Sequence, residues 1–115
     1  MKYGISKVGY GGDEISDEKI VKVEVVEIEL SVMGKLLATK EVVVKGSFTI
    51  QKVEKIIDAM ANGDVFYTIK KVNNLYQLGA EVIDKNNEKI KFITTVPNSL
   101  KSDNLESLPR LSIWD

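Results

Sequence analysis

The strongest pattern in the chain is a run of alternating apolar and charged residues over residues 19–32. Val21, Val23 and Val25 alternate with charged residues, and from Val26 onward the same alternation continues with its phase shifted by one position. A helix would need apolar residues every three to four positions, so the run predicts a long strand. The shift within it predicts a β-bulge, in which one extra residue re-aims the side chains that follow.

Shorter runs on both sides of this strand predict the rest of a mainly antiparallel sheet. Residues 3–10 are expected to form a first strand, and residues 33–35 a tight turn into a strand over 36–45. The segment 19–45 would then be a long hairpin with a charged outer side. Further strands are expected over 65–70, 75–84 and 89–96, with turns at 73–74 and 85–88 and a bulge at Gly79.

One amphipathic helix is predicted between the hairpin and the later strands. Thr49 or Ser47 would cap its start, and Asn62-Gly63 would end it in the left-handed conformation. The expected fold is α+β, a single domain over residues 1–115 in the order β-β-β-α-β-β-β, with a C-terminal segment docked on the sheet. The apolar stripe of the helix is expected to contain Ile50, Val53, Ile57, Met60 and Ala61.

The composition excludes several kinds of catalytic and metal-binding site but does not identify a function. The chain has no cysteine and no histidine, which removes thiolate nucleophiles, sulfur-ligated zinc and the commonest general base. Sixteen basic and seventeen acidic residues leave a net charge of −1, so no general attraction to nucleic acid polymers or anionic membranes is expected. We therefore expect a cytoplasmic protein that is not an enzyme and needs no cofactor.

The segment KSDNLESLPRL, residues 101–111, contains the only arginine, Arg110, in a chain that otherwise uses lysine. A guanidinium is a rigid fork that holds phosphate or carboxylate through two parallel hydrogen bonds. One interpretation is structural: short polar residues cap a helical turn and Arg110 pairs with a local carboxylate. The other is a pocket for a small anion, with Tyr76 as a further aromatic candidate. The residues expected to line this pocket are Arg110, Asp103, Asn104, Asn98, Ser99, Thr94, Thr95, Lys101, Phe92 and Tyr67.

Charged residues elsewhere suggest other interpretations. The acidic loop of residues 13–18 could hold calcium, but it lacks the spacing of a calcium-binding hand, so a solvated turn is favoured and no metal site is predicted. Lys70-Lys71 and residues 89–91 could form a basic strip, or could serve solubility alone. The polar face of the hairpin is a candidate protein interface, with Glu24, Glu27, Glu29 and Lys22 as its expected residues.

Three short motifs resemble a small bacterial and phage family catalogued as a domain of unknown function, number three-eight-nine-two. They are the GDVFYT segment after the helix, KFITTVPN over residues 91–98 and SDNLESLP over residues 102–109. The family-like part spans about residues 46–111. Thr94 departs from the family, which often has a basic residue there, and the hairpin is larger than usual. The resemblance implies a small single domain, and its phage members suggest sequestration of a host nucleotide immune signal.

Together these features predict a binding protein without catalytic activity, assembled as a homo-oligomer through its hairpin or a sheet edge. Its ligand would be a small anion such as a nucleotide, because the side chains offer donors and stacking rings but no acid–base group. The alternative is a protein-interaction module or inhibitor that lays the charged hairpin against a host protein.

Overall fold

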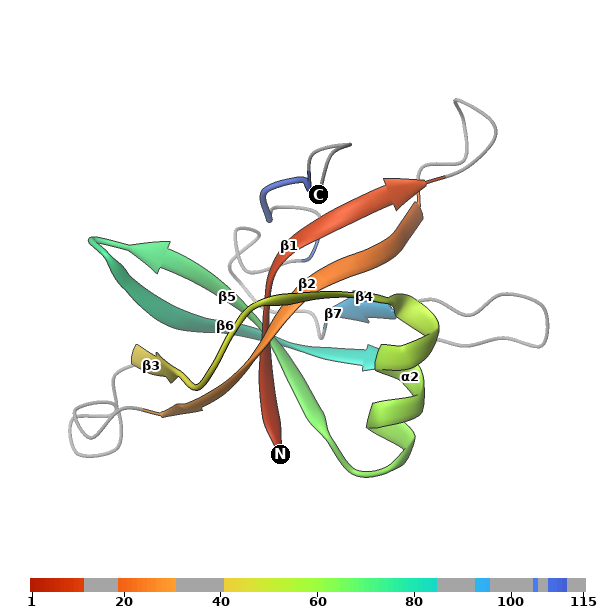
Figure 1. Cartoon of the computed structure of the whole chain (residues 1–115), viewed down its shortest axis with the longest axis horizontal. Coiled ribbons are helices and arrows are strands. Elements are labelled where there is room, and N and C mark those ends of the chain that lie inside the picture. Colours follow the sequence, from red (N-terminus) through yellow and green to blue (C-terminus); the bar gives the residue numbers. More distant parts are fainter. Residues whose placement is uncertain (12–18, 31–40, 85–92, 96–104, 106–107, 112–115) are drawn as a thin grey trace.

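A computed structural model gives the fold of residues 1–11, 19–30, 41–84, 93–95, 105 and 108–111 (Figure 1). These residues contain seven strands and one helix. The strands are β1 (Lys2–Gly11), β2 (Lys19–Leu30), β3 (Glu41–Val44), β4 (Thr49–Lys52), β5 (Val65–Val72), β6 (Leu75–Asp84) and β7 (Ile93–Thr95), and the helix α2 (Val53–Ala61) lies between β4 and β5.

The strands form one sheet whose hydrogen-bonded path returns to its start. The path runs from β1 through β5, β6, β3 and β2, and β2 pairs again with β1. β4 pairs with β2 beyond the end of β3, and β7 pairs with β6. The pairing of β1 with β5 is parallel, and the other pairings between these strands are antiparallel. β2 therefore lies between β1 and β4 over residues 22–25 and pairs with β3 over residues 28–30.

The predicted α+β class and mainly antiparallel sheet are confirmed. The element order differs from the expected one by one strand, because β4 precedes the helix. The hairpin of β2 with β3 is present, with Ile28 opposite Val44 and Leu30 opposite Val42. The C-terminal segment is docked on the sheet as predicted: Leu105 and Leu108 are buried, and Arg110 forms a β-bridge with Val8.

The start of the helix was predicted wrongly. Residues expected in its cap and first turn instead form β4, in which Thr49 lies opposite Val25 and Lys52 opposite Lys22. Helix α2 begins at Val53, with Lys52 at the N-cap and no capping side chain. A side-chain cap contributes only about 1 kcal/mol, whereas β4 satisfies a row of backbone groups along the edge of β2. Strand pairing therefore outweighs the local helix signal.

The end of the helix matches its prediction. Gly63 has a φ of 99°, a left-handed conformation that glycine adopts without steric strain. Its amide donates a hydrogen bond to the carbonyl of Met60 and so satisfies one of the last helical acceptors. The buried face of α2 is narrower than the predicted stripe and consists of Val53, Ile56 and Ile57.

Apolar side chains gather in two clusters. The larger one lies between the sheet, helix α2 and the C-terminal Leu105 and Leu108, and its strand residues include Ile5 and Phe66. The smaller one is formed by β2, β3 and β5, with Phe48 and Tyr76 packed against it. Its buried members are Val26, Ile28, Val42 and Ile69.

The two clusters explain the phase shift in β2. Val25 and Val26 are both buried, but Val25 belongs to the larger cluster and Val26 to the smaller one. Adjacent residues of a strand point to opposite faces, so two buried neighbours require apolar cover on both sides. The predicted bulge in β2 is wrong in its location. Opposite the phase shift, the extra residue lies on the partner strand, where Ile5 pairs with Val25 and Lys7 with Glu24; β2 has its own irregularity nearer its start, between Ile20 and Lys22.

The β5–β6 hairpin follows its prediction closely. Asn73 and Asn74 both have positive φ angles, 52° and 68°, as expected of a type I′ two-residue turn. The register shifts where Tyr67 lies opposite Glu81 but Ile69 lies opposite Leu78, so β6 carries one extra residue beside Gly79. The bulge expected at Gly79 is confirmed.

Candidate functional site

A groove opens where β1 and β5 separate. The two strands pair in parallel from Lys2 and Val65 as far as Ile5 and Thr68. Beyond that point β5 continues with β6, while a short C-terminal strap, residues 109–111, pairs with β1. The Val8 amide donates to the Pro109 carbonyl at 3.0 Å, and the Leu111 amide donates to the Val8 carbonyl at 2.8 Å. The strap thus takes the place of β5 as the neighbour of β1. The groove lies between the strap and the part of β5 that no longer pairs with β1.

The bulge in β1 lies at this gap. Ser6 is the extra residue between Ile5 and Lys7, which pair with adjacent residues of β2. Its side chain is almost completely buried, and its hydroxyl donates a hydrogen bond of 2.7 Å to Oε1 of Glu24. β-Bulges re-aim the residues beside them and occur often next to functional sites. Here the bulge brings Ser6, Lys7 and Glu24 to one wall of the groove.

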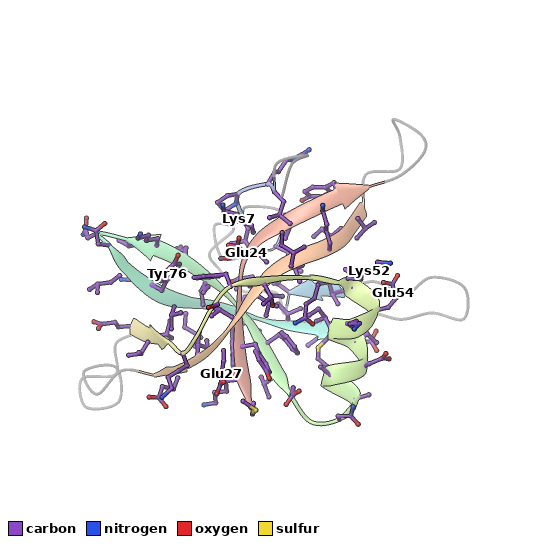
Figure 2. All side chains as sticks on the ribbon, viewed as in Figure 1. Lys7, Glu24, Glu27, Lys52, Glu54 and Tyr76 are labelled. Carbon is purple, nitrogen blue, oxygen red and sulfur yellow. The ribbon has the colours of Figure 1, made fainter. Side chains whose placement is uncertain are left out.

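The groove has a volume of about 300 Å³ and is lined from four strands and the strap. Figure 2 shows Lys7, Glu24 and Tyr76 in one part of the molecule, whereas Lys52 and Glu54 lie at the start of α2. Such a volume is at the small end of the range for ligand pockets, roughly 300–1,000 Å³. The lining residues are Ser6, Lys7, Glu24, Ile69, Lys70, Lys71, Tyr76 and Pro109.

The groove is positively charged in a chain that is slightly acidic. Lys7, Lys70 and Lys71 contribute three positive charges and Glu24 one negative charge, so the local sum is +2 against −1 for the chain. The lysines come from two different strands, and among the described residues neither Lys7 nor Lys71 forms a salt bridge. Like charges gathered in a concave site raise the local potential and attract anions.

Aromatic and apolar groups form the remaining wall. The ammonium of Lys71 lies 5.9 Å from the ring centroid of Tyr76, within the range of a cation–π interaction. The Tyr76 ring also meets Phe48 in a tilted arrangement at 5.8 Å, which links the groove to the smaller cluster. Ile69 and Pro109 complete this side. The groove therefore combines cations, one oriented carboxylate and an apolar wall.

Arg110, the only arginine of the chain, lies beside the groove. The guanidinium of Arg110 lies over the ring of Tyr10 at 4.4 Å, and its neighbour Pro109 lines the groove. Arg110 is exposed and is not one of the lining residues. Its contact with Tyr10 helps to hold the strap on β1.

Two other predicted ligand-binding residues are described, and both lie within the sheet. Thr95 is buried in β7, and Tyr67 is half-buried in β5 opposite Glu81. Thr94 belongs to β7, but its side chain lies outside the described part. The C-terminal pocket thus stays a prediction, because its other residues also lie outside. These are Phe92, Asn98, Ser99, Lys101, Asp103 and Asn104.

The four predicted interface residues have separate surroundings. Glu24 faces the groove, whereas Glu29 forms an exposed salt bridge of 3.5 Å with Lys45, the residue that follows β3. Glu27 lies opposite Tyr3, and the side chain of Lys22 lies across Gly9 of β1. Alternation along β2 puts Lys22 and Glu24 on one face and Glu27 and Glu29 on the other, and the proposed interface stays a prediction. The acidic loop of residues 13–18 and the turn at 85–88 lie outside the described residues.

Sequence reasoning named Lys70, Lys71 and Tyr76 but did not connect them with Ser6, Lys7 or Glu24. The phase shift in β2 was the available signal, because it lies directly opposite the bulge that aims Ser6. What the pattern could not show was which strand carries the extra residue, or that β5 separates from β1 at the same point.

Comparisons with known proteins assign neither a family nor a function to the chain. No family model, curated protein or solved structure matches the chain. The resemblance noted in the sequence therefore stays a prediction. Among the described residues, no helix is long and apolar enough to cross a membrane.

Proposed function

We propose that this protein binds a small anionic ligand, such as a phosphate-bearing metabolite or nucleotide, in the groove between β1 and β5. The observation that carries the proposal is the meeting of Lys7 with Lys70 and Lys71 around a hollow of about 300 Å³. Lysine binds phosphate as a mobile point charge, and three lysines can follow an anion without a rigid geometry. The groove supplies the positive charge that the chain as a whole lacks.

The side chains of the groove favour binding over turnover. Neither histidine nor cysteine occurs anywhere in the chain, so the most frequent acid–base and nucleophilic groups are absent. Ser6 is almost fully buried, and its hydroxyl already donates its hydrogen bond to a carboxylate. A protein with these groups can hold an anion by charge, hydrogen bonds and ring contact.

Calorimetric titration with pyrophosphate and with nucleoside monophosphates tests the proposal. Lys7→Gln and Lys70→Gln should each weaken binding by about fivefold, since removing one partly exposed charge costs about 1 kcal/mol. Affinity should also fall as salt rises, because exposed charges are screened. Lys52→Gln, at the exposed N-cap of α2, is the matched control and should bind as the wild type does.

A role of the hairpin in protein binding makes different predictions. If the face around Glu29 and Lys45 contacts a partner protein, reversing both charges should abolish capture of that partner while the lysine variants have no effect. Absence of binding to every phosphate compound, or equal binding by the Lys7→Gln and Lys52→Gln variants, would reject the groove.

A further inference from the structure

A carboxylate lies on the wall of a groove that is otherwise cationic. Glu24 shares this site with Lys7, Lys70 and Lys71, and its negative charge opposes binding of any simple anion. Such a group favours a ligand only if the ligand also offers hydrogen-bond donors. Glu24 is therefore a feature that binding of inorganic phosphate alone does not explain.

The carboxylate is held in a defined orientation. The Ser6 hydroxyl donates to Oε1 over 2.7 Å, and Ser6 is itself fixed by its burial at the bulge of β1. No described residue donates a hydrogen bond to the second oxygen, Oε2. An ionised carboxylate accepts about four hydrogen bonds, so both oxygens keep capacity for donors on a ligand. Two acceptors side by side match a ligand with two adjacent N–H donors.

The apolar part of the groove lining suits a flat ring. Tyr76, Ile69 and Pro109 present ring and aliphatic surface within the same groove, and Lys71 lies near the Tyr76 ring. Aromatic side chains provide platforms for heterocycles because every base has a π-face. The three lysines would then hold the phosphate of the same molecule. A volume of about 300 Å³ suits one nucleotide unit and not a polymer strand.

On the basis of the proposed function, we infer that the groove prefers guanine nucleotides and that Glu24 reads the base. The Watson–Crick edge of guanine carries the ring N1–H beside the exocyclic amino group, two donors that match the two oxygens of a carboxylate. Adenine and cytosine each place an acceptor nitrogen beside their amino group, and that nitrogen repels a carboxylate oxygen. Hypoxanthine, the base of IMP, has the ring N1–H but no amino group beside it. The expected order of affinity is GMP, then IMP, then AMP.

Titrations of GMP, IMP, AMP and pyrophosphate into the wild type and Glu24→Gln test the inference. The wild type should bind GMP about tenfold more tightly than AMP, because hydrogen bonds to a charged group are worth about that factor in affinity. Glu24→Gln should remove this preference, since an amide replaces one of the two acceptors. The same variant should bind pyrophosphate as tightly as the wild type or more tightly, because a negative charge has left the groove.

Two further variants separate a role in ligand recognition from a general effect on structure. Glu27→Gln lies elsewhere on β2 and should keep the wild-type order of affinities, and Ser6→Ala should reduce the GMP preference only in part. Circular dichroism and thermal unfolding establish that each variant is folded. Equal affinity for GMP and AMP, or a uniform loss for all ligands in Glu24→Gln, would overturn base recognition and leave anion binding intact. Failure of all four ligands to bind would overturn both proposals.

Discussion

Gly79 lies so close to Thr68 that a side chain at this position has no room. A Cβ atom on Gly79 would overlap Thr68 Oγ1. That oxygen also accepts a hydrogen bond of 3.0 Å from the Ala80 amide, which the bulge in β6 presents to it. Thr68 is buried and cannot turn away without leaving this amide without its partner. The glycine is thus required by a close approach between neighbouring strands.

Gly79→Ala should lower the free energy of unfolding by about 2–4 kcal/mol, the combined cost of overpacking and of a lost buried hydrogen bond. Urea denaturation followed by circular dichroism measures the change. Thr68→Ala removes the clashing oxygen, so the double variant should be less destabilised than the sum of the two single variants. Strict additivity would show that the contact does not exist.

At the scale of elements, the described contacts of the strap are made with β1 and the larger cluster. Two backbone hydrogen bonds with Val8 hold it, and the Arg110 guanidinium over Tyr10 closes its outer side. Leu108 anchors the segment in the larger cluster, and Leu111 approaches the backbone of Gly9. Because Pro109 forms part of the groove wall, docking of the strap also shapes the proposed binding site.

Arg110→Ala should loosen the strap without unfolding the sheet. An exposed cation–π contact contributes about 0.5–1 kcal/mol, so amide exchange at Leu111 and Val8 should accelerate about twofold to fivefold. Hydrogen exchange followed by NMR measures these amides directly. Arg110→Lys keeps the charge but not the planar stacking group and should give an intermediate rate. Unchanged exchange at both amides would show that the backbone hydrogen bonds suffice.

At the scale of the whole molecule, the closed path of strands joins the two apolar clusters. β2 contributes Val25 to the larger cluster and Val26 to the smaller one, and β5 contributes Phe66 and Ile69 in the same way. Neither cluster can lose its strands without disturbing the other. We therefore expect one cooperative unfolding transition.

Ile56→Val in the larger cluster and Ile28→Val in the smaller one form a matched pair. Each should lower the free energy of unfolding by about 0.5–1.5 kcal/mol, the usual cost of removing one buried methylene group. In both variants, far-ultraviolet circular dichroism and amide resonances from both clusters should report a single shared midpoint in urea. Separate midpoints for the two clusters would show that the ring of strands does not couple them.

The local pattern was sufficient for most elements and for the class of the fold. Alternation predicted β2, the pair Asn73-Asn74 predicted the hairpin turn, and Gly63 predicted the end of α2. These signals act within a few residues, where backbone sterics and burial on one or two faces decide the outcome. Local preference failed at β4, where pairing with β2 outweighed a helix cap.

The candidate site depended on contacts between distant parts of the chain. Ser6, Glu24, Tyr76 and Pro109 are far apart in sequence, and they meet because β5 leaves β1 where the strap joins it. No periodicity records which strand carries a bulge or where two parallel strands separate. Both features belong to pairings between strands that are distant in sequence. Local chemistry therefore determined the strands and turns, and long-range pairing alone placed the lysines around a groove.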